Sequence, residues 1–265
     1  MNDLLSAIIL GIIQGLTEFL PVSSSGHLEL AKYIIGEDKM PSESLMMTVV
    51  LHFGTALATV YVFRVEILNI IQKFFSRNDH EEKAFVWKII LSMIPAAIVG
   101  LLFEKQLESL FTQNILLVCA MLVLTGILLF IADRATYTDQ SVTYKNAFKI
   151  GIAQAIAITP GISRSGATIA TSVLLGIDRS KAAEFSFLMV VPLIFGKMAK
   201  DLMEGDFTSS EIALAPLGLG FIVSFFTGIF ACKWMIKIVR KSQLRYFAWY
   251  CIIVGVVGVL YAILK

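Results

Sequence analysis

Long apolar runs recur along this chain, and they limit its fold more than any other feature does. A helix needs about 20 apolar residues to cross the hydrocarbon core of a bilayer. Apolar residues make up 57% of the 265 residues and charged residues only 16%, so a soluble domain of this size could not bury them in one core. The pattern predicts an all-α, polytopic membrane protein that forms a single integral membrane domain over residues 1–265. We expect six transmembrane helices, at Leu45–Phe63, Phe85–Phe103, Ile115–Ala132, Ala182–Ala199, Ile212–Cys232 and Tyr246–Leu264.

Two further apolar regions, Leu4–Ile35 and Phe148–Leu175, are each interrupted by a proline and by a turn rich in Ser and Gly. Each region is too long for one span and too broken for two. Irregular backbone at membrane depth survives only where protein covers it or where it lines a watery cavity. We therefore interpret both regions as re-entrant helical hairpins.

The two broken regions resemble one another. When residues 11–36 are shifted by 140 and compared with residues 151–176, seven of 26 positions are identical without a gap. The identical pairs are Gly11/Gly151, Ile12/Ile152, Gln14/Gln154, Ser23/Ser163, Ser25/Ser165, Gly26/Gly166 and Gly36/Gly176. Chance similarity between two apolar stretches rich in Ser and Gly is the alternative. We favour an internal repeat, over residues 1–132 and 145–265, that is inverted in the membrane and places a site where its halves meet.

The distribution of Lys and Arg predicts the orientation, because cytoplasmic loops carry an excess of these residues. With six spans and two hairpins, fourteen of them lie on one side and six on the other, while Lys88 and Arg164 lie within membrane segments. The fourteen lie in the loops at 64–83, 134–149, 179–181 and 233–245. We expect this side to be cytoplasmic, so the first hairpin enters from outside and the second from the cytoplasm.

The first hairpin carries polar residues around its turn. Gln14 and Glu18 are four residues apart and therefore share one face of the entering helix. Pro21 ends that helix because it excludes the preceding residue from the helical region. The serines at 23–25 are good N-caps for the next helix, whose N-terminus would attract anions, and His27 would lie in its first turn.

The second hairpin has the same plan, with a Pro-Gly break at 160–161, a cap rich in serine and a new helix. Arg164 stands where the first region has Ser24. An arginine inside an apolar segment is costly and usually marks a functional site, and its planar fork of donors matches phosphate oxygens. Two opposed helix N-termini and one arginine predict a phosphate-binding pocket.

Simpler interpretations exist for each of these residues. Glu18 and Arg164 could form a structural ion pair, His27 could act only as a hydrogen-bonding residue, and the serines could serve only as caps. His52, in the middle of a span, is expected to be a buried hydrogen-bonding residue, and Glu184 and Lys197 to be polar packing residues. We prefer a functional interpretation because Glu, His, Ser, Arg and Thr side chains gather at the two turns. The three cysteines, Cys119, Cys232 and Cys251, lie in or beside apolar segments and are expected to pack there.

The two turns also resemble a known family. The motifs QGLTE and FLPVSSSGH, followed later by PGISRSGAT, are similar to those of bacterial undecaprenyl-diphosphate phosphatases linked to bacitracin resistance. The resemblance implies hydrolysis of undecaprenyl diphosphate to undecaprenyl phosphate and inorganic phosphate, which recycles the lipid carrier of cell-wall synthesis. It also implies a bacterial inner-membrane protein, a divalent cation and a site open to the outer face of that membrane.

The resemblance assigns roles residue by residue. Ser24 and His27 match the family's catalytic serine and histidine, and Gln14 and Glu18 match its first acidic motif. This chain has Gln at the first position of that motif, so Gln14 can be a ligand but not a general base. Its second motif matches residues 160–166, and its nearby threonine matches Thr168.

These residues together suggest a phosphoryl-transfer site, which needs in-line attack and neutralised charge. Glu18, with Gln14, would hold Mg²⁺ or Ca²⁺ against the diphosphate. The nucleophile could be Ser24 activated by His27, or His27 itself; we favour Ser24. Glu18 and Arg164 complete the catalytic set. The residues expected to bind the phosphates are Ser23, Ser25, Ser163, Ser165, Gly166 and Thr168.

The expected partners are the polyprenyl diphosphate substrate and membrane lipids, and the sequence leaves a homodimer open. The net charge of +2 gives no reason to expect nucleic-acid binding. The N-terminal residues lack the basic region and cleavage site of a signal peptide, so we expect no cleaved leader.

Three other classes of protein share some of these features. Histidine-dependent lipid phosphatases share the sequence Ser-Gly-His but need a second histidine, and none follows His80. A transporter or flippase of lipid phosphates would also use inverted repeats with broken helices, but it has no need of a nucleophile and base such as Ser24 and His27. A non-catalytic scaffold leaves the charges of Glu18 and Arg164 in apolar surroundings unexplained.

Overall fold

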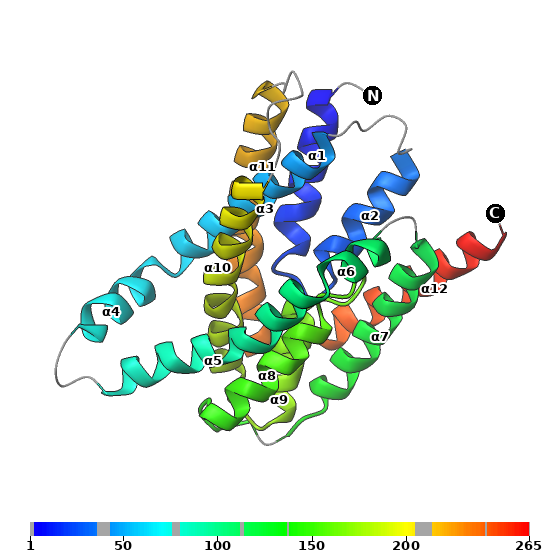
Figure 1. Ribbon diagram of the computed structural model, residues 1–265. Helices are drawn as coiled ribbons and strands as arrows, with labels where there is room; N and C mark the ends of the chain where they lie inside the picture. The colour runs from blue at the N-terminus through cyan, green and yellow to red at the C-terminus, as the bar shows by residue number, and fades with distance from the viewer. Residues whose placement is uncertain are drawn as a thin grey trace.

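The computed structural model describes residues 3–35, 43–75, 80–111, 114–136, 138–204, 214–241 and 243–264. Within these ranges every regular element is an α-helix, and a single β-bridge joins Gln140 to Ile177. The all-α prediction is therefore confirmed for the described residues (Figure 1). The helices are α1 (Asp3–Thr17), α2 (Ser24–Ile35), α3 (Glu43–Val62), α4 (Arg64–Phe74), α5 (His80–Leu102), α6 (Glu104–Phe111), α7 (Ile115–Asp133), α8 (Tyr144–Ile156), α9 (Arg164–Leu174), α10 (Arg179–Glu204), α11 (Leu214–Arg240) and α12 (Arg245–Leu264).

Several helices are suited to a bilayer. Among the described residues α5, α7, α11 and α12 are long and apolar enough to cross one, and α3 with α4 makes a fifth if the bent pair counts as one span. The bend between α3 and α4 is 72° and falls at Phe63. A multi-pass membrane protein is therefore supported by four or five candidate spans among the described residues, and the count of six stays a prediction. The remaining predicted span, Ala182–Ala199, lies within the continuous helix α10.

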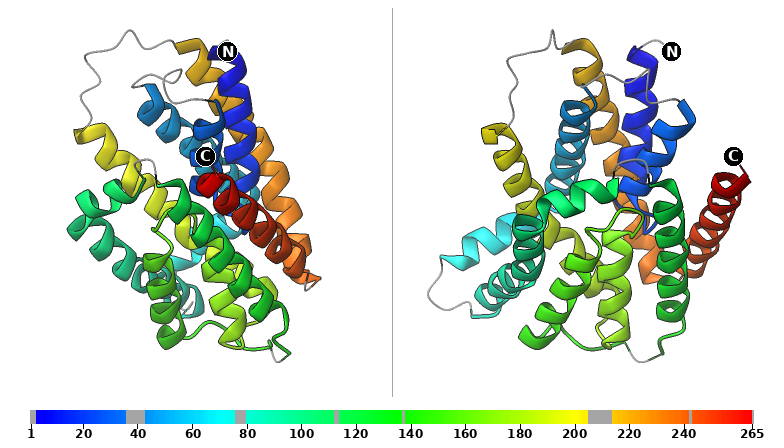
Figure 2. Two further views of the ribbon diagram at one scale, coloured as in Figure 1. Left: turned by 90° about the vertical axis from the view of Figure 1, so that its right-hand side faces the viewer. Right: turned by 45° about the vertical axis from the view of Figure 1, so that its right-hand side comes forward.

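Both broken regions are helix–turn–helix units. In the first, α1 and α2 are joined through residues 18–23, and in the second, α8 and α9 are joined through residues 157–163. Figure 2 shows α1 and α2 in the upper half of the molecule and α8 and α9 in the lower half, so the two turns meet between them. The Ser165 hydroxyl donates to the carbonyl oxygen of Leu20 at 3.2 Å, which joins the turns directly.

Small residues allow the helices around these hairpins to approach closely. α1 packs along α11, α8 along α5, and α12 along α7. A Cβ atom on Gly15 would lie 1.8 Å from the Thr227 hydroxyl oxygen, and one on Gly126 would lie 2.7 Å from the Ala248 carbonyl oxygen. Backbone approach through small residues is the usual means of helix association within a membrane.

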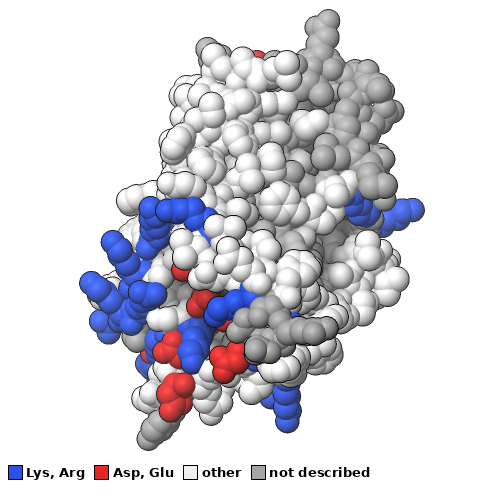
Figure 3. Space-filling model, turned by 90° about the vertical axis from the view of Figure 1, so that its left-hand side faces the viewer, with Lys and Arg blue, Asp and Glu red and all other residues white. Residues whose placement is uncertain are grey.

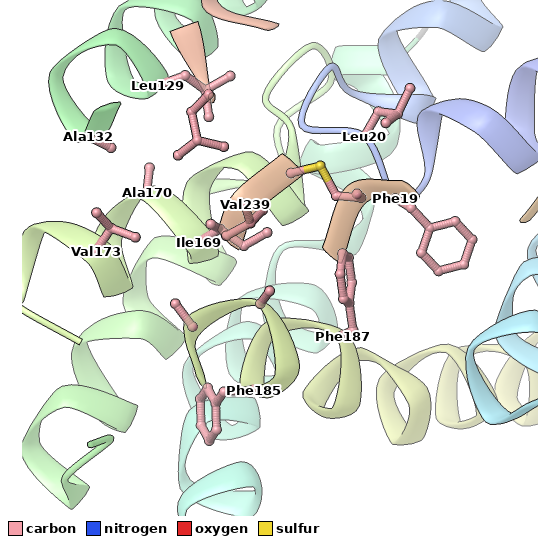
Figure 4. Close-up of a cluster of buried hydrophobic side chains, with 14 of the residues drawn as sticks. Phe19, Leu20, Leu129, Ala132, Ile169, Ala170, Val173, Phe185, Phe187 and Val239 are labelled. Atoms are coloured by element: carbon pink, nitrogen blue, oxygen red, sulfur yellow. The ribbon is translucent and has the colours of Figure 1, made fainter. Parts of the chain in front are cut away.

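The main hydrophobic core lies directly beside the first turn. Phe19 and Leu20, which follow Glu18, are buried in it with residues of α7, α9, α10 and α11 (Figure 4). The Phe19 ring meets the Phe187 ring edge-on at 5.8 Å between centroids. Because Glu18 is next in sequence to these buried side chains, the core determines where its carboxylate lies.

Charged side chains are unevenly distributed over the surface. On the face shown in Figure 3 most of the Lys and Arg side chains, and the Asp and Glu side chains near them, lie in the lower half. The loops with the excess of Lys and Arg contribute to this end. The separation agrees with the charge bias in the sequence, and which side of the membrane this end faces stays a prediction.

Candidate active site

Glu18 is the centre of the site. Its side chain is only 8% exposed, and its carboxylate accepts hydrogen bonds from Arg164 Nη2 at 2.5 Å, Ser24 Oγ at 2.8 Å and Gln14 Nε2 at 3.0 Å. Gln14 reaches Glu18 because residues four apart share a helix face, and the helical bond from Glu18 N to Gln14 O continues past the end of α1. The fold thus brings four of the predicted residues together, and Arg164 comes from 146 residues away.

The two serine caps have matching geometry. Ser23 Oγ accepts from Gly26 N at 3.2 Å at the start of α2, and Ser163 Oγ accepts from Gly166 N at 3.0 Å at the start of α9. Ser23 has a φ of 69°, a left-handed conformation that is uncommon for serine. Each cap satisfies one donor of a helix N-terminus. In each turn the cap also lies 3.3 Å, between hydroxyl oxygens, from the serine two residues later.

The other predicted phosphate donors of the second turn are bonded within the protein. Ser163, Ser165 and Thr168 are at most 2% exposed. Thr168 Oγ1 donates to the Arg164 carbonyl oxygen at 2.9 Å and lies 2.6 Å from the Ser186 hydroxyl oxygen. In this structure these side chains hold the turn that carries Arg164, and direct contact with phosphate stays a prediction.

His27 does not form the expected pair with Ser24. Its Nδ1 lies 2.8 Å from the Ser23 carbonyl oxygen and its Nε2 lies 2.7 Å from the Tyr250 hydroxyl oxygen. Ser24 donates to Glu18 instead. The physical reason is helical geometry: His27 lies one turn beyond Ser23, whose carbonyl oxygen takes the imidazole N–H, and the ring then faces α12. The favoured scheme, with His27 as the base of Ser24, differs from this arrangement.

Helix α3 contributes polar residues that the sequence analysis did not place in the site. The Thr55 hydroxyl lies 3.5 Å from Gln14 Nε2, and His52 Nε2 lies 3.9 Å from a Glu18 carboxylate oxygen. His52 is also bonded to the Thr48 carbonyl oxygen, which agrees with the hydrogen-bonding role expected for it. The sequence did contain a pattern that could have indicated them: Thr48, His52, Thr55 and Thr59 are three or four residues apart. Polar residues at this spacing form one stripe on an apolar helix.

Two polar atoms of the site are buried and, within the described part of the chain, have no hydrogen-bond partner: Gln14 Oε1 and Arg164 Nη1. Buried polar atoms are normally bonded; Asp133 Oδ1, Gln154 Oε1 and Arg179 Nη1 share this state elsewhere, but only the Gln14 and Arg164 atoms lie around Glu18. One is an acceptor beside a carboxylate and the other is a cationic donor. This pair fits a site that receives a cation and an anion together.

The donor set fits a divalent cation only if the substrate supplies other ligands. The described residues contain no cluster of three or more His, Cys, Asp or Glu side chains that could hold a metal ion. The Glu18 carboxylate and the side-chain amide oxygen of Gln14, Oε1, are hard oxygen donors. Mg²⁺ commonly binds through one or two carboxylates plus substrate phosphates.

Comparisons with known proteins agree on one family. The family model described as bacitracin resistance protein BacA matches residues 7–257. A protein of Christiangramia forsetii named undecaprenyl-diphosphatase is 59% identical over 260 residues, 98% of each chain. Proteins with the same name from Parabacteroides distasonis and Methanobrevibacter smithii are 44% and 38% identical, over 98% and 96% of each chain. The chain therefore belongs to the BacA family of bacitracin resistance proteins.

Proposed function

We propose that this protein is an undecaprenyl-diphosphate phosphatase of the membrane, which releases inorganic phosphate and returns the lipid carrier to cell-wall synthesis. The observation that carries the proposal is the cluster of Glu18, Ser24 and Arg164 where two helical hairpins meet. It combines a hydroxyl nucleophile, a carboxylate and a cationic fork in apolar surroundings. The relatives' name, undecaprenyl-diphosphatase, supports the same activity.

The contacts suggest how the residues divide the chemistry. Arg164 binds the terminal phosphoryl group through the Nη1 atom that has no protein partner, while Nη2 stays on Glu18. Ser24 attacks the terminal phosphorus, its proton passes toward the Glu18 carboxylate that already accepts it, and undecaprenyl phosphate leaves with the bridging oxygen. Water then hydrolyses the phosphoserine. Such a reaction depends mainly on positioning and on neutralising charge.

A divalent cation is the proposed cofactor. Glu18 and Gln14 would hold Mg²⁺ or Ca²⁺, which would neutralise part of the diphosphate charge. His52 lies 3.9 Å from a Glu18 carboxylate oxygen and is not among the proposed ligands.

The proposed topology has six spans and two re-entrant hairpins in a bacterial inner membrane, with the site open to the outer side. Its support is the break in each hairpin, the close approach of the two turns and the Lys and Arg excess at one end. An outward site suits a lipid carrier that is released where wall precursors are consumed.

The test is phosphate release from purified protein supplied with farnesyl diphosphate, with and without a chelator. We expect turnover with Mg²⁺ or Ca²⁺, loss of turnover with EDTA, and recovery when the cation is returned. The control is the Glu18→Gln variant, which keeps a side chain of the same size but presents an amide, and should be inactive. Movement of a lipid phosphate between leaflets without phosphate release would instead support the transporter alternative.

A further inference from the structure

Tyr250 of α12 is bound to His27 although it belongs to neither motif at the hairpin turns. Its hydroxyl oxygen lies 2.7 Å from His27 Nε2. The two rings are also stacked, with centroids 5.6 Å apart and planes 12° from parallel. The two residues are 223 positions apart in the sequence, so no local pattern indicates the contact.

The partners of His27 decide which ring nitrogen carries the proton. A backbone carbonyl oxygen can only accept, so Nδ1, which lies 2.8 Å from the Ser23 carbonyl oxygen, must be the protonated nitrogen. In a neutral imidazole the other nitrogen, Nε2, is then the acceptor, and the Tyr250 hydroxyl donates to it. The ring is held at both ends and on one face.

The neighbouring residue ties the same part of α12 to the first turn. The Cys251 thiol lies 3.6 Å from the Pro21 carbonyl oxygen, and Cys251 and Ala248 are fully buried in the main core with Phe19 and Leu20. Tyr250 itself is 43% exposed, so its ring is available at the edge of the site and its helix is fixed.

We infer that Tyr250 is a positioning residue of the active site: it holds the His27 imidazole in one orientation, with Nε2 as the basic nitrogen. The inference rests on the proposed phosphatase function, because an effect of Tyr250 on turnover can be measured only if the protein hydrolyses a diphosphate. It extends the site from the two hairpins to α12, and it accounts for a histidine that is not bonded to Ser24.

The first arm of the test is kinetic, with farnesyl diphosphate as substrate. Tyr250→Phe keeps the stacked ring and removes only the hydroxyl. We expect kcat to fall about tenfold, the size of one lost hydrogen bond, with little change in KM. The matched control is Tyr246→Phe, one turn earlier on α12, where the ring lies under the Arg245 guanidinium. This control should keep the kcat of the parent.

The second arm reads the imidazole directly. The chain has three histidines, so ¹⁵N-histidine labelling gives a simple spectrum that His52→Gln and His80→Gln variants assign. We expect the parent to show His27 with a protonated Nδ1 and an unprotonated Nε2, and Tyr250→Phe to show a change in the Nε2 signal. When the parent releases phosphate, the inference stands only if both kcat and this signal change in Tyr250→Phe and neither changes in Tyr246→Phe; any other combination overturns it. If the parent releases no phosphate at all, the proposed function fails, and the spectrum alone decides whether Tyr250 positions His27.

Discussion

At the scale of single residues, Arg164 makes the contact that joins the second hairpin to the Glu18 carboxylate. One guanidinium nitrogen is bonded to Glu18, and another is buried without a protein partner among the described residues. An unsatisfied buried donor costs about 1–3 kcal/mol, and although Arg179 Nη1 is in the same state, only the Arg164 atom lies beside the Glu18 carboxylate and the Ser24 hydroxyl. The second nitrogen is therefore the atom that we assign to substrate phosphate.

The first prediction follows from this geometry. Arg164→Lys keeps the charge but loses the planar fork, so turnover of farnesyl diphosphate should fall by about 10²-fold or more, as for the loss of a key donor to a transition state. The measurement is kcat for purified protein. Arg179→Lys is the matched control: this buried arginine donates to the carbonyl oxygens of Asp133 and Ala135, away from Glu18, and its turnover should stay near that of the parent. Full activity of Arg164→Lys would remove Arg164 from the phosphate site.

The second prediction separates the two nucleophiles. If Ser24 attacks, Ser24→Ala should lose most activity, and His27→Ala should lose less, because Glu18 and not His27 accepts the Ser24 proton. Phosphate trapped on the protein should then survive acid, since phosphoserine is acid-stable. Acid-labile phosphate on the parent, together with an active Ser24→Ala variant, would identify His27 as the nucleophile and contradict the scheme in which Ser24 attacks.

At the scale of elements, the turn of the second hairpin depends on its glycine. Gly161 has a φ of 90°, and a Cβ atom there would lie 2.2 Å from the Val118 carbonyl oxygen. Both the backbone conformation and the contact with α7 therefore exclude a side chain. The same glycine supplies the carbonyl oxygen that accepts from Thr125, whose hydroxyl also receives the Ser163 N–H.

The third prediction concerns this turn. Gly161→Ala should cost about 1–3 kcal/mol through backbone strain, and more if α7 has to move. It should lower the thermal unfolding midpoint in detergent and reduce turnover, because Arg164 follows three residues later. Gly100→Ala on α5 is the control, since nothing lies within 4 Å of its added Cβ atom; it should be neutral or gain about 0.5–1 kcal/mol in helix stability. Equal midpoints for the two variants would show that the turn tolerates a side chain.

At the scale of the whole molecule, the charge bias and the opposed hairpins together predict how the protein is oriented in the membrane. If the end rich in Lys and Arg faces the cytoplasm, the start of α11 lies outside and its end lies inside. Leu214, at the start, is 80% exposed, and Lys241, just after the end, is also exposed.

The fourth prediction uses these two positions. A cysteine at Leu214 should react with a membrane-impermeant maleimide in intact spheroplasts, and a cysteine at Lys241 only in inverted vesicles. The parent chain is a suitable blank because Cys119, Cys232 and Cys251 are buried. Labelling of both positions from one side would exclude the proposed topology and the outward-facing site with it.

The sequence by itself determined the features that depend on neighbours in the chain. Apolar runs about 20 residues long placed the long helices, and the proline with its serine-rich turn placed both hairpins, because span length, proline sterics and helix capping are local effects. The spacing of Gln14 and Glu18 predicted that they share one face of a helix. The free-energy cost of an arginine inside an apolar segment marked Arg164 as a candidate site residue. These residues do meet in the structure.

Only the tertiary structure decided which side chains bond to which. Ser24 is bonded to Glu18 and His27 to Tyr250, and Thr55 lies against Gln14 from 41 residues away. The bend of 72° between α3 and α4 also departs from a straight span. Local pattern fixes the spacing of residues along a helix but not the rotation of that helix against its neighbours. That rotation is set by packing, here by close contacts such as Gly15 against Thr227 and by the core around Phe19 and Phe187, whose residues are distant in sequence.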